Sequence, residues 1–185
     1  MDRRRALLAC ALLAPALGAR AAPAASPGER ADGLPQRIAG WLLRPDAGGV
    51  LEPMRWEHPP ALLAVFFGAH TCGPCRAFTP TLIGVRNALR AAGADTEVVY
   101  AALDDRAADV RRTMLDTGMP WPALDVRRAG IDPAMRRLAG LATPNLVLVD
   151  SGGAVLASAW EGRRYPGLEP VLRRWHAWAA AHTGM

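Results

Sequence analysis

An apolar run at 62–67 leads, after four residues, into two cysteines three positions apart, Cys72 and Cys75. Every residue of the run is apolar, which is typical of a buried strand. Proline is favoured in the first turn of a helix, so Pro74 indicates that a helix begins at the cysteine pair; it is predicted to span 74–92 and to end at Gly93. A strand that passes directly into a helix constrains the chain to an α/β arrangement with both cysteines at the junction.

The position of the two cysteines predicts their chemistry. Backbone N–H groups and the helix dipole at a helix N-terminus favour the thiolate form of a cysteine there. We therefore expect Cys72 to be the attacking thiol and Cys75, one turn deeper, to resolve the mixed disulfide that Cys72 forms. A disulfide over so short a separation restricts little of the unfolded chain, so the pair is interpreted as chemistry rather than reinforcement.

Alternating strands and helices complete the expected architecture. Apolar runs predict strands at 62–67, 98–103, 146–149 and 155–160, with a weaker one at 41–43, and helices are predicted at 74–92, 106–117, 133–139 and 169–182. A turn signal, Asp-Ser-Gly-Gly at 150–153, predicts that the last two strands pair antiparallel. The order predicts an α/β fold with a central mixed β-sheet flanked by helices.

The first 21 residues have the three-part layout of a secretory signal peptide. Arginines at 3–5 precede an apolar run at 6–17, and cleavage is expected after Ala21 or Ala22. Lipidation at Cys10 is an alternative, but only four apolar residues separate it from the arginines. An uncleaved anchor is the other alternative, although about 20 apolar residues are needed to span a bilayer.

Residues 22–33 are rich in Ala, Pro, Ser and Gly and are interpreted as a flexible linker, which leaves a single domain at 34–185. All 22 basic residues are arginines. Loss of residues 1–21 removes four arginines and Asp2, so the net charge falls from +5 to +2. Since no basic stripe interleaved with aromatic residues is present, binding to nucleic acid is not expected.

The motif Cys72-Gly73-Pro74-Cys75 is identical to the active-site tetrapeptide of thioredoxin, and Pro80 matches a helix-kinking proline of that family. Around it the chain resembles the nucleoredoxin and tryparedoxin branch of the thioredoxin-like superfamily, as an exported bacterial member. The matching segments are Phe-Phe-Gly-Ala at 66–69, Arg-Ala-Phe-Thr-Pro at 76–80 and Met-Pro-Trp at 119–121. The resemblance implies a thioredoxin fold over about 34–180. It also implies that Thr143-Pro144 is a cis-proline loop that faces the cysteines and binds substrate.

Three positions near the motif bear on how the cysteines react. Thr71 replaces the tryptophan usual in the family, so part of the substrate-facing surface differs. Phe66 stands where thioredoxin has a buried aspartate that helps to deprotonate the resolving cysteine, so Cys75 must lose its proton in another way. His70 or a water could assist, although an exposed loop histidine without a catalytic role is the simpler interpretation.

The resemblance implies a thiol-disulfide oxidoreductase that uses the Cys72–Cys75 disulfide and no other cofactor. Gly-Pro between the cysteines favours a reducing couple, since thioredoxin lies near about −270 mV and the periplasmic oxidant near about −120 mV. We therefore expect a periplasmic monomer that reduces disulfides of exported proteins and is itself reduced by a membrane-bound thiol donor.

Two alternatives remain. One is a disulfide oxidase or isomerase on the same fold, because threonine before the cis-proline also resembles the periplasmic isomerase. That isomerase usually carries a dimerisation domain, for which this length leaves no room. The other is a copper- or zinc-binding chaperone that uses His70, Cys72 and Cys75 as ligands, although structural zinc would need a fourth.

Protein recovered from the producing cell is expected to lack the first 21 or 22 residues, because the arginine-led apolar segment ends in small residues that signal peptidases accept. N-terminal sequencing checks this expectation. A chain that still begins at Met1 or Asp2 would show that the segment is not a cleaved signal.

Overall fold

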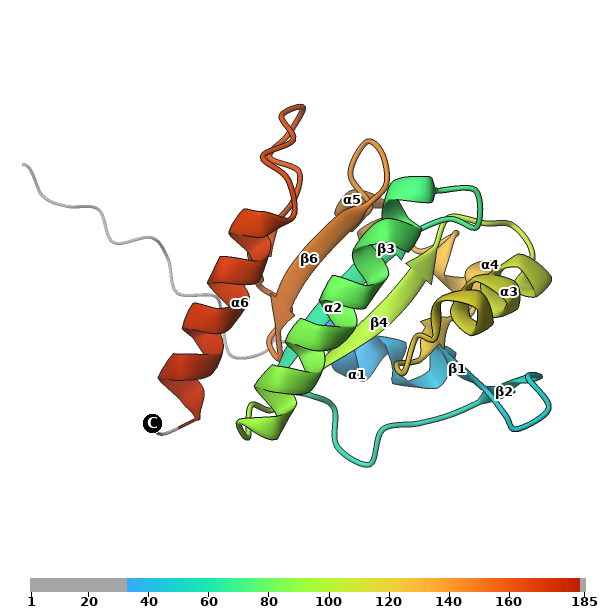
Figure 1. Ribbon diagram of the computed structural model, residues 1–185, viewed down its shortest axis with the longest axis horizontal. Helices are drawn as coiled ribbons and strands as arrows, with labels where there is room; N and C mark the ends of the chain where they lie inside the picture. The colour runs from blue at the N-terminus through green and yellow to red at the C-terminus, as the bar shows by residue number, and fades with distance from the viewer. Residues whose placement is uncertain (1–32, 184–185) are drawn as a thin grey trace, which may run out of the picture.

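A seven-stranded mixed sheet organises the computed structural model, which describes residues 33–183 (Figure 1). The strands are β1 (Leu42–Pro45), β2 (Leu51–Pro53), β3 (Leu62–Gly68), β4 (Thr96–Ala102), β5 (Ala123–Leu124), β6 (Asn145–Asp150) and β7 (Val155–Ser158). Their order across the sheet is β2-β1-β5-β4-β3-β6-β7. β4 pairs parallel with β3 and β5, and the remaining neighbours pair antiparallel.

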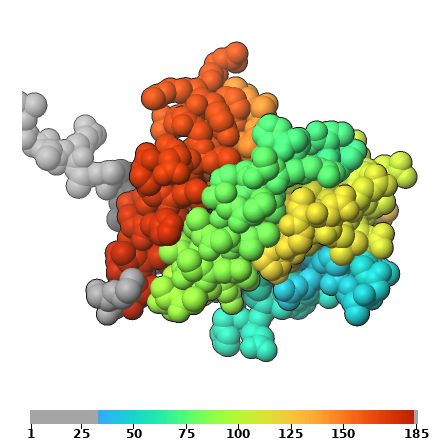
Figure 2. Space-filling view, in the orientation of Figure 1, coloured from blue at the N-terminus to red at the C-terminus, as the bar shows by residue number. Residues whose placement is uncertain are grey.

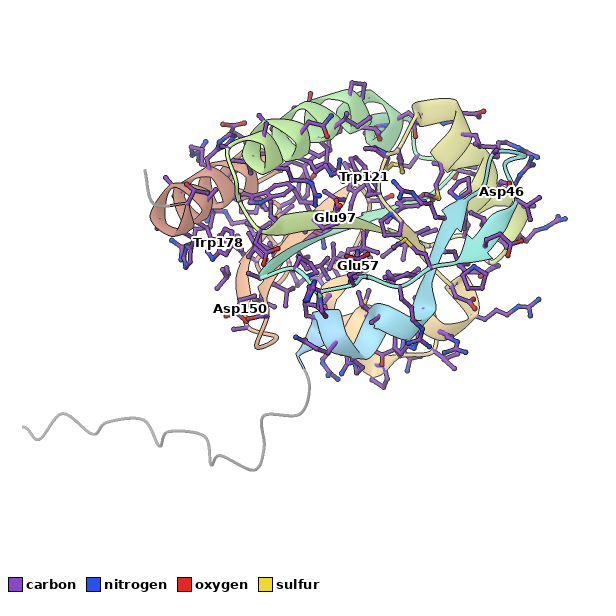
Figure 3. The ribbon with its side chains drawn as sticks, turned by 90° about the horizontal axis from the view of Figure 1, so that it is seen from below. Asp46, Glu57, Glu97, Trp121, Asp150 and Trp178 are labelled. Carbon is purple, nitrogen blue, oxygen red and sulfur yellow. A yellow bond between two sulfur atoms is a disulfide. The ribbon has the colours of Figure 1, made fainter. Side chains whose placement is uncertain are left out.

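Helices cover both faces of this sheet and confirm the predicted α/β architecture. They are α1 (Leu34–Ile38), α2 (Gly73–Ala91), α3 (Ala107–Thr117), α4 (Val126–Ala129), α5 (Pro133–Leu138) and α6 (Glu169–His182), with a 3-10 turn at Ala39–Trp41. α2, α3 and α6 pack on one face, which Figure 2 shows from outside, and α1, α4 and α5 pack on the other. Figure 3 shows the sheet between these two layers, with Trp121 on the side of α2.

β3 lies at the centre of the molecule and is buried at all seven positions. Alternate residues of a strand point to opposite faces. Leu62, Ala64 and Phe66 accordingly join the core under α2, α3 and α6, whereas Leu63, Val65 and Phe67 join the core under α1, α4 and α5. Because both faces are covered, the strand is apolar throughout instead of alternating with polar residues.

The C-terminal helix α6 packs on the sheet near the start of β4. Val171, Leu172 and Trp175 are buried against it, and Trp175 Nε1 donates a hydrogen bond of 2.9 Å to Thr96 Oγ1 at the start of β4. This apolar stripe is therefore part of the core, as the spacing of three and four residues predicts. None of the helices within residues 33–183 has the length and apolar character needed to cross a bilayer.

The long elements end within two residues of their predicted bounds, and β6 and β7 pair antiparallel as expected. Sequence patterns missed β2, β5, α1 and α4, which have between two and five residues each and are too short for a periodic signal. The predicted signal peptide at 1–21, Cys10 and linker residues 22–32 lie outside the described residues.

Candidate active site

The cysteine pair lies where β3 passes into α2; Figure 1 shows the start of α2 in the upper part of the molecule. Cys72 has an extended backbone and caps the helix: its Sγ accepts a hydrogen bond of 3.2 Å from the backbone N–H of Cys75. Pro74 occupies the first turn, where its missing N–H costs no helical hydrogen bond. The helix therefore begins within one residue of the predicted start at 74, with Gly73 and Pro74 exposed in its first turn.

The two cysteines form a disulfide, with their Cα atoms 5.3 Å apart. Their environments differ, since Cys72 is half-buried and Cys75 is only 3% exposed. An incoming molecule can thus reach Cys72 from solvent, whereas Cys75 is covered. The N–H that now contacts Cys72 Sγ is also placed to stabilise a thiolate there. The arrangement fits an attacking role for Cys72 and an internal role for Cys75.

His70 is held firmly in the loop before Cys72. Asp104, which follows β4, accepts two hydrogen bonds of 3.1 Å from the His70 backbone N–H and lies 2.6 Å from its ring Nδ1. Arg76 donates to the His70 carbonyl at 3.0 and 3.2 Å. The His70 side chain is about one-third exposed and paired with a carboxylate, so it is more constrained than the expected exposed loop histidine, and its catalytic role stays a prediction. Thr71, by contrast, is exposed.

Sequence reasoning missed Asp104, although a signal was present. β3 and β4 are parallel neighbours, with Gly68 opposite Ala102, so the residues after both strands meet at one edge of the sheet. An acidic pair, Asp104-Asp105, directly after a predicted buried strand could have been assigned to this edge.

The predicted substrate loop reaches the same end of the sheet. Asn145 pairs with Phe67, so Thr143 and Pro144 lie level with the end of β3, and the peptide bond between them is cis. Both residues are half-buried. The buried Asn145 side chain donates to the carbonyls of Leu138 and Ala139 and ties the loop to the end of α5.

Trp160 and Tyr165, two aromatic residues after β7, contact the other side of the loop that contains Pro144. Neither was identified from the sequence. Trp160 Nε1 donates to the Ala142 carbonyl at 2.9 Å, and the Tyr165 hydroxyl donates to the Pro144 carbonyl at 3.0 Å. The two rings pack together with centroids 4.8 Å apart. We call Trp160 and Tyr165 the aromatic clamp.

A second aromatic cluster belongs to the same part of the core as Cys75. Phe66 and Tyr100 are buried with ring centroids 6.0 Å apart, and Phe78 of α2 packs on Phe66. Burial, followed by the charge of Asp104, raises the pKa of Tyr100 far above its usual value, and Thr113 and Arg76 oppose this with smaller effects. Tyr100 therefore stays protonated across the physiological pH range.

No cluster of three or more His, Cys, Asp and Glu side chains within residues 33–183 is arranged to hold a metal ion. His70, Cys72 and Cys75 do not form such a set, since the two sulfurs are bonded to each other and the His70 ring contacts Asp104. The geometry gives the copper- or zinc-binding alternative no support.

The structure combines a mixed β-sheet with a disulfide at the start of the helix that follows the central strand. These two features place the protein in the class of dithiol-disulfide proteins. The family model described as thioredoxin-like matches residues 60–155, which is more than half of the chain. The protein therefore belongs to the thioredoxin-like family, and the predicted thioredoxin fold is confirmed.

Nucleoredoxins are among its relatives in sequence. Nucleoredoxin of Mus musculus is 30% identical over 120 residues, which are 64% of this chain and 26% of that protein. Probable nucleoredoxin 3 of Oryza sativa is 39% identical over 64 residues, 34% of this chain and 13% of that protein. The chain thus spans about a quarter or less of the relatives that it matches, and these matches support the predicted nucleoredoxin and tryparedoxin branch.

Solved structures share the fold. The thioredoxin domain of a thiol-disulfide oxidoreductase from Bacteroides vulgatus superposes with a TM-score of 0.55 at 17% identity, covering 80% of this chain and 98% of that one. A mutant tryparedoxin-I gives a TM-score of 0.57 at 23% identity, covering 76% and 94%. At these identities the neighbours establish the common architecture and no more.

In the reduced protein, an alkylating reagent at neutral pH is expected to label Cys72 faster than Cys75, by on the order of tenfold, because Cys72 is accessible and caps the helix. Mass spectrometry of quenched samples follows both sites, and the single variants Cys72→Ser and Cys75→Ser assign each rate. Equal rates, or faster labelling of Cys75, would contradict these roles.

Proposed function

We propose that this protein is a periplasmic thiol-disulfide oxidoreductase that reduces disulfides of exported proteins through the Cys72–Cys75 pair. The observation that carries the proposal is the disulfide itself, with an accessible sulfur at the N-terminus of α2 and a buried sulfur behind it. The reaction needs no cofactor besides this pair.

Catalysis proceeds by two exchanges. The Cys72 thiolate attacks one sulfur of the substrate disulfide; the substrate S–S bond breaks, and the departing sulfur leaves as a thiolate that takes a proton from water. The Cys75 thiolate then attacks Cys72 Sγ, which releases the second substrate sulfur and closes the Cys72–Cys75 disulfide. Two electrons have passed to the substrate, and a thiol donor must return them before the next cycle.

Substrate docking is assigned to the loop at Thr143 and Pro144. Proline has no backbone N–H, so Pro144 offers no donor that competes for the Cys72 sulfur, whereas the Thr143 backbone can pair with an extended substrate segment. The aromatic clamp and Asn145 support this loop from two sides, which keeps it level with the end of β3.

The reducing direction rests on the Gly73-Pro74 dipeptide, since the residues between the cysteines tune the potential of such pairs. Location in the periplasm and a membrane-bound thiol donor rest on the N-terminal segment. Structural neighbours include a protein named as a thiol:disulfide interchange protein from Bacteroides sp., with a TM-score of 0.53 at 18% identity. The oxidase or isomerase alternative keeps one argument, the threonine at position 143.

A glutathione redox titration of the Cys72–Cys75 pair is expected to give a midpoint below about −200 mV, nearer to thioredoxin than to the periplasmic oxidant. The fraction of disulfide at each ratio of glutathione to its disulfide is measured after acid quenching and thiol labelling. A midpoint above this value would favour the oxidase over the reductase.

Replacement of Pro144 by alanine adds a backbone N–H beside the active site and is expected to slow substrate release, so that mixed disulfides accumulate on Cys72. Non-reducing electrophoresis detects them, most clearly in a Cys75→Ser background. Pro133→Ala, at the exposed start of α5, is the matched control. If Pro144→Ala reduced substrate at the parental rate and trapped nothing, the docking assignment would be wrong.

A further inference from the structure

The hydroxyl of Tyr100 is buried without a hydrogen-bond partner. Tyr100 is 1% exposed, and its hydroxyl makes no hydrogen bond within residues 33–183, although the Thr113 side chain lies near enough to lower the Tyr100 pKa. The nearby Thr113 hydroxyl donates instead to the Asp109 carbonyl at 2.9 Å. A buried polar group without a hydrogen bond destabilises the fold, and such groups in folded proteins call for an explanation.

The unpartnered hydroxyl borders the same small space as the sulfur of Cys75. A methyl group added to Gly68 would lie 3.5 Å from both Cys75 Sγ and the Tyr100 oxygen, and 3.1 Å from the Tyr100 ring. The absent side chain of Gly68 therefore leaves room between the two groups. Once the disulfide opens, Cys75 Sγ can turn about its Cα–Cβ bond into this space.

The surroundings give a thiolate at Cys75 few other partners. Cys75 shares an apolar core cluster with Phe66 and Phe78, and no carboxylate stands at position 66 to accept its proton. The charged and titratable groups around this cluster are Asp104, which is engaged by His70, and Arg76, which donates to the His70 carbonyl.

We propose that Tyr100 is a positioning residue whose hydroxyl donates a hydrogen bond to the Cys75 thiolate while the mixed disulfide on Cys72 is resolved. This assignment rests on the proposed function. Tyr100 acts as a donor and not as a base, since it keeps its proton throughout. The Tyr100 hydroxyl on β4 thus stabilises the Cys75 thiolate as a neutral donor, whereas the Phe66 side chain on β3 has no polar group that could assist.

The step balances as follows. The Cys75 thiol releases its proton to water, and the Tyr100 hydroxyl stabilises the resulting thiolate. That thiolate attacks Cys72 Sγ, the bond between Cys72 and the substrate sulfur breaks, and the substrate leaves as a thiolate. Tyr100 neither gains nor loses a proton, so its contribution depends on the fraction of Cys75 that is ionised.

The roles of the two cysteines can be measured separately when the reduced protein reacts with the aromatic disulfide dithiobis-nitrobenzoate, because the reaction has two successive steps. Attack by Cys72 releases one coloured thiolate, and resolution by Cys75 releases the second. In Tyr100→Phe the first release is expected to keep its parental rate. The second release is expected to slow about tenfold at neutral pH, because without the hydrogen bond the fraction of Cys75 present as thiolate falls about tenfold, which corresponds to a shift of about one pH unit. At high pH, where Cys75 is fully ionised in both proteins, the two rates are expected to converge.

Gly68→Ala tests the contact from the other side, because the added methyl group fills the space between hydroxyl and sulfur. It is expected to slow the second release as Tyr100→Phe does, and the double variant should be no slower than either single one. Thr117→Val, which removes a half-buried hydroxyl with its own partner on α3, is the matched control and should resolve at the parental rate.

Parental resolution by Tyr100→Phe at every pH would overturn the assignment. A slowing of both releases, or of the second release by the same factor at all pH values, would also overturn it, since that result indicates general loosening of the core. If the parent protein itself never releases the second thiolate, the proposed function fails, and the role of Tyr100 fails with it.

Discussion

Burial of β3 between two helical layers holds the rest of the structure in place. Its side chains alternate between the two cores, and full burial of each large apolar side chain contributes about 1.5–3 kcal/mol. A shift of one residue in register would exchange every side chain between the two layers. Because the strand is fixed in this way, Gly68 and the start of α2 are fixed too, and the reactive sulfurs lie at the edge of a rigid sheet.

Contacts from other elements then position the short loop between β3 and α2. Asp104 binds both the backbone and the ring of His70, and Arg76 reaches back from α2 to the carbonyl of the same residue. The loop is therefore tied to β4 on one side and to α2 on the other. On the far side of β3, the buried Asn145 and the aromatic clamp hold the loop that contains Pro144.

The sequence predicted those parts of the molecule in which local signals and tertiary packing agree. The apolar run at 62–67, the helix that starts at Pro74 and the turn at 150–153 each combine a strong pattern with a defined end, and all three were predicted correctly. Short elements such as β5 and α4 depend on their neighbours for stability and leave no periodic pattern. The pairing of His70 with Asp104 and the closeness of Tyr100 to Cys75 arise from the register of β3 against β4, which the sequence alone does not state.

The aromatic clamp lies beyond residue 155, outside the segment that the family model matches, whereas the disulfide, His70, Tyr100 and Asp104 lie inside it. Part of the support of the Pro144 loop, the aromatic clamp, is thus encoded outside the stretch that carries the cysteines, whereas Asn145 lies within it. Changes at Trp160 or Tyr165 would therefore act on the conformation of the Pro144 loop without altering a residue that contacts the disulfide.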